Sequence, residues 1–84
     1  METRIAVIAI IVNDAKEGVE ELNALLSEYS ERIIGRMGIP YRAKSVNIIS
    51  VAIDAPQDEI STLTGKIGRL KGISVKTAYA PMGQ

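Results

Sequence analysis

The sequence predicts an α+β domain whose elements follow the order strand, helix, strand, strand, helix, strand, the ferredoxin-like βαββαβ arrangement. Four short segments have the patterns of strands, two longer ones have apolar residues at helical spacing, and turn residues separate them. Right-handed crossovers place the first and third strands at the centre of a four-stranded antiparallel sheet, with both helices on one face. The 84 residues have room for one domain, residues 1–84.

The first strand is predicted at residues 4–12, and it is apolar on both faces. Successive side chains of a strand point to opposite faces, so a half-buried strand should alternate apolar with polar residues. Here one face carries Ile5, Val7, Ala9 and Ile11, and the other carries Ala6, Ile8, Ile10 and Val12. A chain with two helices can cover only one of these faces.

The first helix is predicted after a turn at Asn13 and Asp14, which supply an N-cap, with Glu17 placed to satisfy free N–H groups. Its apolar stripe consists of Val19, Leu22, Leu25, Leu26 and Tyr29.

The second strand is predicted at residues 32–39, ending before Pro40, which lacks the N–H that a ladder requires. Alternation puts Ile33, Gly35, Met37 and Ile39 on one side and Arg32, Ile34, Arg36 and Gly38 on the other. A polar connection through Arg42, Lys44 and Ser45 follows.

The third strand, residues 46–54, is again apolar on both sides, and Ile48 and Ala52 belong to the face without helices. The second helix is predicted to have Pro56 in its first turn, the acids Asp58 and Glu59 near its start, and Gly72 as its stop. Its apolar stripe consists of Ile60, Leu63, Ile67 and Leu70. The last strand is predicted at residues 73–79, with Ile73, Val75, Thr77 and Tyr79 opposite Ser74, Lys76 and Ala78.

The sheet face without helices is expected to exceed the few hundred Å² of apolar surface that soluble monomers usually expose. We therefore expect a homo-oligomer, a dimer or tetramer, formed through sheet faces or edges. The alternative is that the small residues Ala6, Ala9, Ser50 and Ala52 make the face tolerable to water.

The composition excludes several classes of function. Ten Lys and Arg balance ten Asp and Glu, which argues against direct binding of nucleic acid or a membrane surface. The chain has no Cys and no His, so we expect no disulfide, no metal site and no cofactor, and no histidine catalysis. No signal peptide is recognisable and the first apolar run is far shorter than the ~20 residues of a membrane span, so we expect a cytoplasmic protein.

The sequence contains fragments of phosphate-binding motifs, but none is complete. The run at residues 65–68, Gly-Lys-Ile-Gly, matches the nucleotide-clamping loop of KH domains, yet the helical stripe continues through it and favours a helix turn. Arg36, Arg42 and Lys44 form a small basic group that either meets an anionic ligand or is a solvated edge. No nucleophile, base and oxyanion donor come together, so we do not expect an enzyme.

Three segments together resemble a known family: residues 4–12, 33–42 and 63–70, of which the run Ile-Ile-Gly-Arg-Met-Gly-Ile-Pro-Tyr at 33–41 is the most specific. The chain resembles the iron-only hydrogenase system regulators, small proteins that are similar to ACT domains and to the C-terminal domains of nickel repressors. The likeness covers essentially the whole chain. It implies an oligomer in an anaerobe that regulates expression or maturation of iron-only hydrogenase by sensing a ligand or contacting a protein.

The resemblance also suggests where a ligand would bind. Nickel repressors use His and Cys, which are absent here, so nickel sensing is excluded. ACT domains use the turn after the first strand, close to a subunit interface. By this likeness the candidate ligand-binding residues, facing one another across an interface, are Asn13, Asp14, Ala15, Gly35, Arg36, Met37 and Gly38.

Three hypotheses about function follow. The first is a non-enzymatic regulatory module that senses a small molecule or contacts a separate protein partner. The second is a structural assembly or maturation partner without a ligand. The third is a small hydrolase of phosphate substrates, which would depend on Arg36 or Arg42. For regulation of transcription we expect DNA to be reached through a separate protein.

Overall fold

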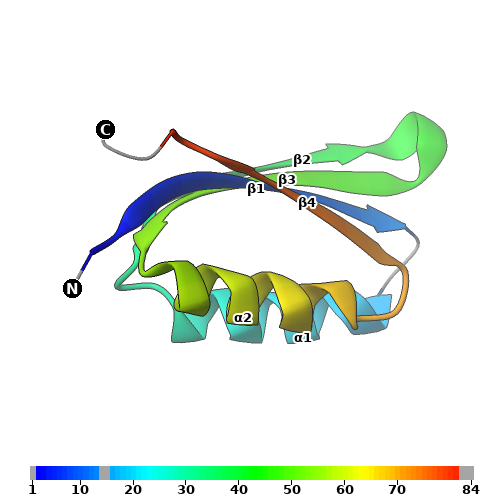
Figure 1. Cartoon of the computed structure of the whole chain (residues 1–84). Coiled ribbons are helices and arrows are strands. Elements are labelled where there is room, and N and C mark those ends of the chain that lie inside the picture. Colours follow the sequence, from blue (N-terminus) through cyan, green and yellow to red (C-terminus); the bar gives the residue numbers. More distant parts are fainter. Residues whose placement is uncertain (1, 14–15, 82–84) are drawn as a thin grey trace.

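A computed structural model of the protein describes residues 2–13 and 16–81. It contains, in chain order, β1 (Arg4–Asn13), α1 (Lys16–Glu28), β2 (Ile33–Tyr41), the 3-10 turn η1 (Arg42–Lys44), β3 (Val46–Ala55), α2 (Gln57–Gly68) and β4 (Ile73–Tyr79). The four strands form one antiparallel sheet in the order β2-β3-β1-β4. Both helices lie side by side under one face of this sheet, and no helix or strand of residues 2–13 and 16–81 covers the opposite face (Figure 1). The predicted ferredoxin-like fold, with β1 and β3 central, is confirmed.

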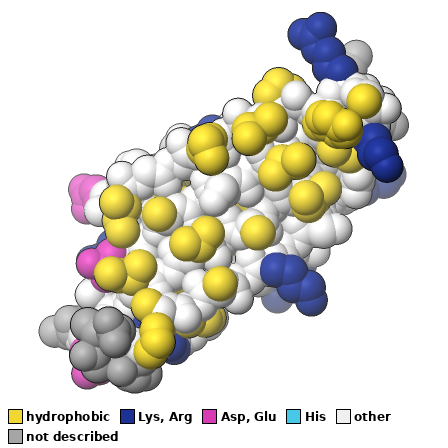
Figure 2. Space-filling view, turned by 90° about the horizontal axis from the view of Figure 1, so that it is seen from above, with side chains coloured by type: hydrophobic (Ala, Val, Ile, Leu, Met, Phe, Trp, Pro, Cys, Tyr) yellow, Lys and Arg dark blue, Asp and Glu magenta, His cyan; other side chains and the backbone are white. Residues whose placement is uncertain are grey.

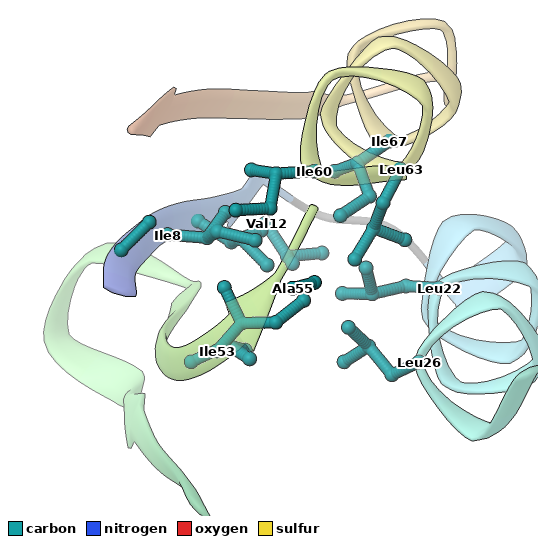
Figure 3. Close-up of a cluster of buried hydrophobic side chains, with 12 residues drawn as sticks. Ile8, Val12, Leu22, Leu26, Ile53, Ala55, Ile60, Leu63 and Ile67 are labelled. Atoms are coloured by element: carbon teal, nitrogen blue, oxygen red, sulfur yellow. The ribbon is translucent and has the colours of Figure 1, made fainter. Parts of the chain in front are cut away.

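The hydrophobic core lies between the sheet and the two helices (Figure 3). Every second side chain of β1 is fully buried in it. The helices contribute the predicted stripes, which meet the buried side chains of β3. The fully buried residues are Ala6, Ile8, Ile10, Val12, Leu22, Leu26, Val51, Ile53, Ala55, Ile60, Leu63 and Ile67. Ala6, predicted to soften the open face, therefore lies in the core instead.

The pairing of β2 with β3 contains a β-bulge that the alternation of the sequence does not reveal. Ile33 pairs with Ile53 and Gly35 with Ala52, so one extra residue, Ile34, is inserted into β2 between these pairs. Because side chains alternate with a period of two, the extra residue reverses the faces. The prediction that Ile33 shares a face with Gly35 is thus wrong: Ile33 packs against the core, while Gly35 shares a face with Ala52.

The prediction that β2 ends before Pro40 is also wrong, because the strand continues to Tyr41. The backbone N–H of Asp54 donates to the carbonyl of Arg32 at 3.0 Å, which shows that even-numbered residues of β3 direct their hydrogen bonds toward β2. Pro40 pairs with Asn47, an odd-numbered residue, so the missing N–H of Pro40 lies on the free edge of the sheet. An edge strand tolerates proline in this position.

Three predicted helix boundaries shift. Asn13, predicted in the turn, is the last residue of β1 and donates its N–H to the carbonyl of Gly72 at 2.7 Å. Pro56 precedes α2 as its N-cap residue instead of lying in its first turn. The helix ends at Gly68, and Gly72 adopts a φ of 73° in the turn before β4. Asp14, the other predicted N-cap, lies outside the described residues.

The two glycines Gly72 and Gly65 allow a matched test of backbone conformation. Gly72→Ala forces a side chain into the left-handed region, so we expect a loss of about 1–2 kcal/mol in the free energy of unfolding. Gly65→Ala lies in α2, where a Cβ would meet nothing within 4 Å, so we expect a gain of about 1 kcal/mol. Urea unfolding followed by circular dichroism at one protein concentration measures both. A Gly72→Ala variant as stable as the wild type would contradict the left-handed conformation of Gly72, and a loss for Gly65→Ala would contradict its open helical position.

Candidate functional site

The most prominent surface of the molecule is the sheet face opposite the helices, here called the open face. Cross-strand pairs on it align in rows: Ile39, Ile48 and Ile11 in one row, and Gly35, Ala52 and Val7 in another. The row between them consists of Met37, Ser50 and Ala9, with Lys76 on β4 beyond Ala9. The remaining members are Ile5, Asn13, Tyr41, Val46, Asp54, Ser74 and Ala78.

Large aliphatic side chains on the open face are solvent-exposed. Ile5 is 50% exposed, Met37 61% and Ile39 49%, and Val7, Ile11, Tyr41 and Ile48 are likewise exposed. Hydrophobic side chains extend over the face from end to end, whereas Lys, Arg, Asp and Glu side chains lie at its rim (Figure 2). Exposed apolar surface of this extent marks an interaction site in soluble proteins.

Strand β2 is uncovered on both of its faces. All of its residues after Ile33 are exposed, although the segment includes three large apolar side chains besides Tyr41, namely Ile34, Met37 and Ile39. Its outer edge is free as well, because β2 is the first strand of the sheet. An apolar edge strand in this state is a liability unless another surface covers it.

The structure places the predicted ligand-binding residues at two separate positions. Gly35, Arg36, Met37 and Gly38 lie in β2, with Gly35 and Met37 on the open face and the other two on the helix side. Asn13 is the last residue of β1 and lies in the same row as Tyr41 of β2, two strands away. Relative to Met37, it is displaced by about 10 Å across the sheet and, over four residues, by about 13 Å along the strands. Among the described residues, Asn13 is therefore not brought together with the group on β2 within one copy. Asp14 and Ala15 lie outside the described residues.

The surroundings of Arg36 are those of a solvated side chain with one polar neighbour. Its guanidinium donates from Nη2 to Oδ1 of Asn23 on α1 at 2.9 Å, and the group is exposed. A Cβ at Gly35 would meet nothing within 4 Å, and one at Gly38 would meet only Cγ1 of Ile49 at 3.9 Å. On the helix side of β2, Gly38 therefore leaves room two residues from the exposed guanidinium of Arg36, which suits an anionic ligand or an acidic side chain.

A polar cluster at the other end of the sheet was not predicted. The guanidinium of Arg4 lies 4.4 Å from the ring centroid of Tyr79, donates to Oε1 of Gln57, and donates to the carbonyl of Ala80 at 3.1 Å. Gln57 in turn donates from Nε2 to the hydroxyl of Tyr79 at 2.9 Å. The hydrogen-bonded partners are 22 to 76 residues apart, so no local sequence signal could have found the cluster. It ties the start of β1 to β4 and α2.

Arg32 makes a second unpredicted contact, a two-pronged ion pair with Glu59 on α2 at 3.2 and 3.3 Å. Both side chains are more than a third exposed, so the pair contributes at most about 1 kcal/mol. It anchors the start of β2 to the helix layer.

Within the described part of the chain, no three Asp or Glu side chains come close enough to hold a metal ion. The segment at residues 65–68 lies inside or at the end of α2, with Ile67 buried, as the helix-turn reading predicts. No helix within residues 2–13 and 16–81 is long and apolar enough to cross a membrane.

Comparison with known proteins gives one family and a set of similar folds. A family model described as "TM1266-like: Iron-only hydrogenase system regulator, putative" matches residues 4–77. No curated protein matches the sequence. Among solved structures, the chain is similar to the uncharacterized protein TM1266 from Thermotoga maritima, with 34% identity, a TM-score of 0.92, and 95% of this chain and 100% of that chain covered.

More distant structures share the fold alone. The ACT domain from GTP pyrophosphokinase of Chlorobium tepidum has 17% identity and a TM-score of 0.77, with 90% of this chain and 99% of that chain covered. The C-terminal domain of the MgtC protein from Mycobacterium tuberculosis has 10% identity and a TM-score of 0.72, with 96% and 92% covered. The fold is therefore ACT-like.

The exposed position of Arg36 predicts that it has little part in stability. We expect Arg36→Ala to change the free energy of unfolding by less than about 0.5 kcal/mol, because only one exposed hydrogen bond is lost. Leu63→Ala, which opens a cavity in the core, should cost about 2–5 kcal/mol in the same urea titration. A loss above about 1.5 kcal/mol for Arg36→Ala would show that this side chain serves the fold.

Proposed function

The chain belongs to the TM1266-like family of iron-only hydrogenase system regulators, and from this membership we propose that it is a non-enzymatic regulatory module. It works as a homo-oligomer and transmits its effect by binding a small molecule or by contacting another protein. The observation that carries the proposal is the open face, whose large aliphatic side chains are exposed in the lone chain. A surface of this kind stabilises a protein only when something covers it.

The chemistry of the open face supports binding rather than catalysis. Its central rows offer aliphatic groups and one hydroxyl, that of Ser50, which supply van der Waals contact and no acid–base pair. Regulatory modules on this fold place their function in sites added to the sheet and its edges, so fold alone does not name the ligand.

Ligand sensing is the first form of the proposal. The exposed guanidinium of Arg36, with free space at Gly38 on the same side of β2, fits a ligand that carries a carboxylate or phosphate group. The candidate group around Asn13 lies on a different part of the same sheet, so both groups could contribute only if a second copy brings them together. A shared site of this kind would make ligand binding and self-association reinforce each other.

Protein contact without a ligand is the second form, and the aliphatic character of the open face favours it. In this form the protein is an assembly or maturation partner of the iron-only hydrogenase system, and any effect on transcription passes through a separate DNA-binding protein. Apolar side chains on an uncovered sheet suit a broad protein surface better than a small polar ligand.

A thermal-shift screen of amino acids, nucleotides and iron-containing metabolites tests the sensing form. A ligand that binds the folded state at 100 times its Kd adds about 2.7 kcal/mol, enough to raise the Tm clearly. We expect Arg36→Ala to abolish the shift and Arg69→Ala, another exposed arginine, to retain it. A shift that both variants retain would place the ligand elsewhere.

Absence of any shift would exclude the sensing form and leave protein contact. In that case, the tagged protein expressed in its native host should co-purify with hydrogenase maturation proteins. Met37→Arg should reduce their yield, because it weakens the oligomer on which the contact depends, while Ile34→Arg should not. If no compound raises the Tm and no maturation protein co-purifies, the proposed function is contradicted.

A further inference from the structure

We propose that the open face packs against the same face of a second copy of this chain, with the free strand edges left unpaired. The proposal rests on the self-association contained in the proposed function and specifies how it is made. The edges and the open face are the two surfaces through which a second copy could join. The structure distinguishes between them.

Both edges of the sheet carry features that block pairing. On β2 the bulge at Ile34 interrupts the strand near its start, and Pro40 removes an outward N–H near its end. Bulges and edge prolines are devices by which natural sheets avoid edge-to-edge association. On β4 the charged side chain of Lys76 stands in the middle of the strand, another such device. Lys76 also belongs to the open face, but only at its β4 rim, and the central rows carry no charged side chain on β2, β3 or β1.

The size of the open face matches what a stable dimer requires. Four strands about 4.8 Å apart and up to ten residues long cover roughly 600 Å². Side chains make the accessible surface larger than this flat area, and a standard interface buries about 800 Å² on each partner. Among the described residues its charged groups are Lys76 and Asp54, which lie on the edge strand β4 and at the end of β3. Lys76 shares the row of Ser50 and Ala9, so the two copies of Lys76 meet at the rim of the interface, where each long side chain can keep its ammonium group in water.

The rows of the open face are complementary to themselves. The row of Ile39, Ile48 and Ile11 has large side chains and is called here the tall row. Four residues away along each strand lies the row of Gly35, Ala52 and Val7, called the low row because its residues on β2 and β3 are small. A twofold axis that crosses the strands at Ser50 and Ala9 lays each tall row over the partner's low row. Ile39 then stands above Gly35 and Ile48 above Ala52. This large-on-small arrangement is how facing sheets fill the ~10 Å between them, and it identifies the occupant as a second copy.

The position of the face is tested by sedimentation equilibrium. We expect the wild type to have a mass of at least twice 9.1 kDa. Ile48→Arg, with its side chain in the tall row, should raise the dissociation constant by roughly 100-fold or more, because each copy loses an apolar contact and buries a charge. Ile34→Arg is the matched control: Ile34 is 64% exposed but, as the inserted residue of the bulge, belongs to none of the cross-strand rows, so the mass should not change.

Circular dichroism shows whether the variants fold, and Met37→Arg provides a second variant at a position already 61% exposed in the lone chain. A wild type that stays monomeric at high concentration overturns the proposal. An oligomer that survives both Ile48→Arg and Met37→Arg also overturns it, while leaving the regulatory proposal intact, because association would then use another surface. A dimer of this form that binds neither ligand nor protein would instead contradict the proposed function alone.

The orientation of the two copies is tested by mixing charge variants. Ile48→Glu and Ala52→Lys should each be largely monomeric alone, and a mixture should restore a heterodimer, because position 48 faces position 52 of the partner. If the axis ran along the strands instead, position 48 would face position 11, and Ile48→Glu would pair with Ile11→Lys. Recovery of the dimer only in the second mixture overturns the proposed axis.

Discussion

The structure depends on one constraint: the central strands are apolar on both faces, and the chain has helices for only one. On the covered face, each fully buried aliphatic side chain contributes about 1.5–3 kcal/mol relative to exposure, which makes the contact between β1, β3 and the two helices the main source of stability. On the other face, equivalent residues such as Ile5 and Ile48 contribute little while they remain in water. The fold of a single copy thus leaves a large part of its hydrophobic free energy unused.

The contrast between the helix-covered face and the open face bears on what proteins of this fold share. The ACT domain from GTP pyrophosphokinase shares the βαββαβ framework at 17% identity, as expected when a pattern of buried positions is retained and individual residues change. TM1266 shares it at 34% identity. A helix-covered core is sufficient for a common fold, which by itself does not determine function.

The sequence was sufficient to predict the order of the elements and the central place of the two strands apolar on both faces, because period and crossover handedness are local or general rules. It was insufficient in β2. The inserted residue at Ile34 obeys no local pattern, and whether Pro40 ends or continues a strand depends on which side of the sheet lies next to it. The polar cluster of Arg4, Gln57 and Tyr79 depends wholly on tertiary proximity. The candidate site was limited in the same way: residue types suggested Asn13 and Arg36, and only coordinates show them on strands that are not neighbours.

The uncovered state of β2 also has a dynamic consequence. Beyond Ile33 this strand is attached to the molecule chiefly by its ladder to β3 and by the contact of Arg36 with Asn23, and its side chains make no part of the core. Detaching it would expose little additional apolar area, so its amides belong to a low-energy opening unit and would exchange with solvent well before those of β1. Any surface that covers β2 therefore also rigidifies it. Slower hydrogen exchange of the β2 amides would then report association at a place distant from the core.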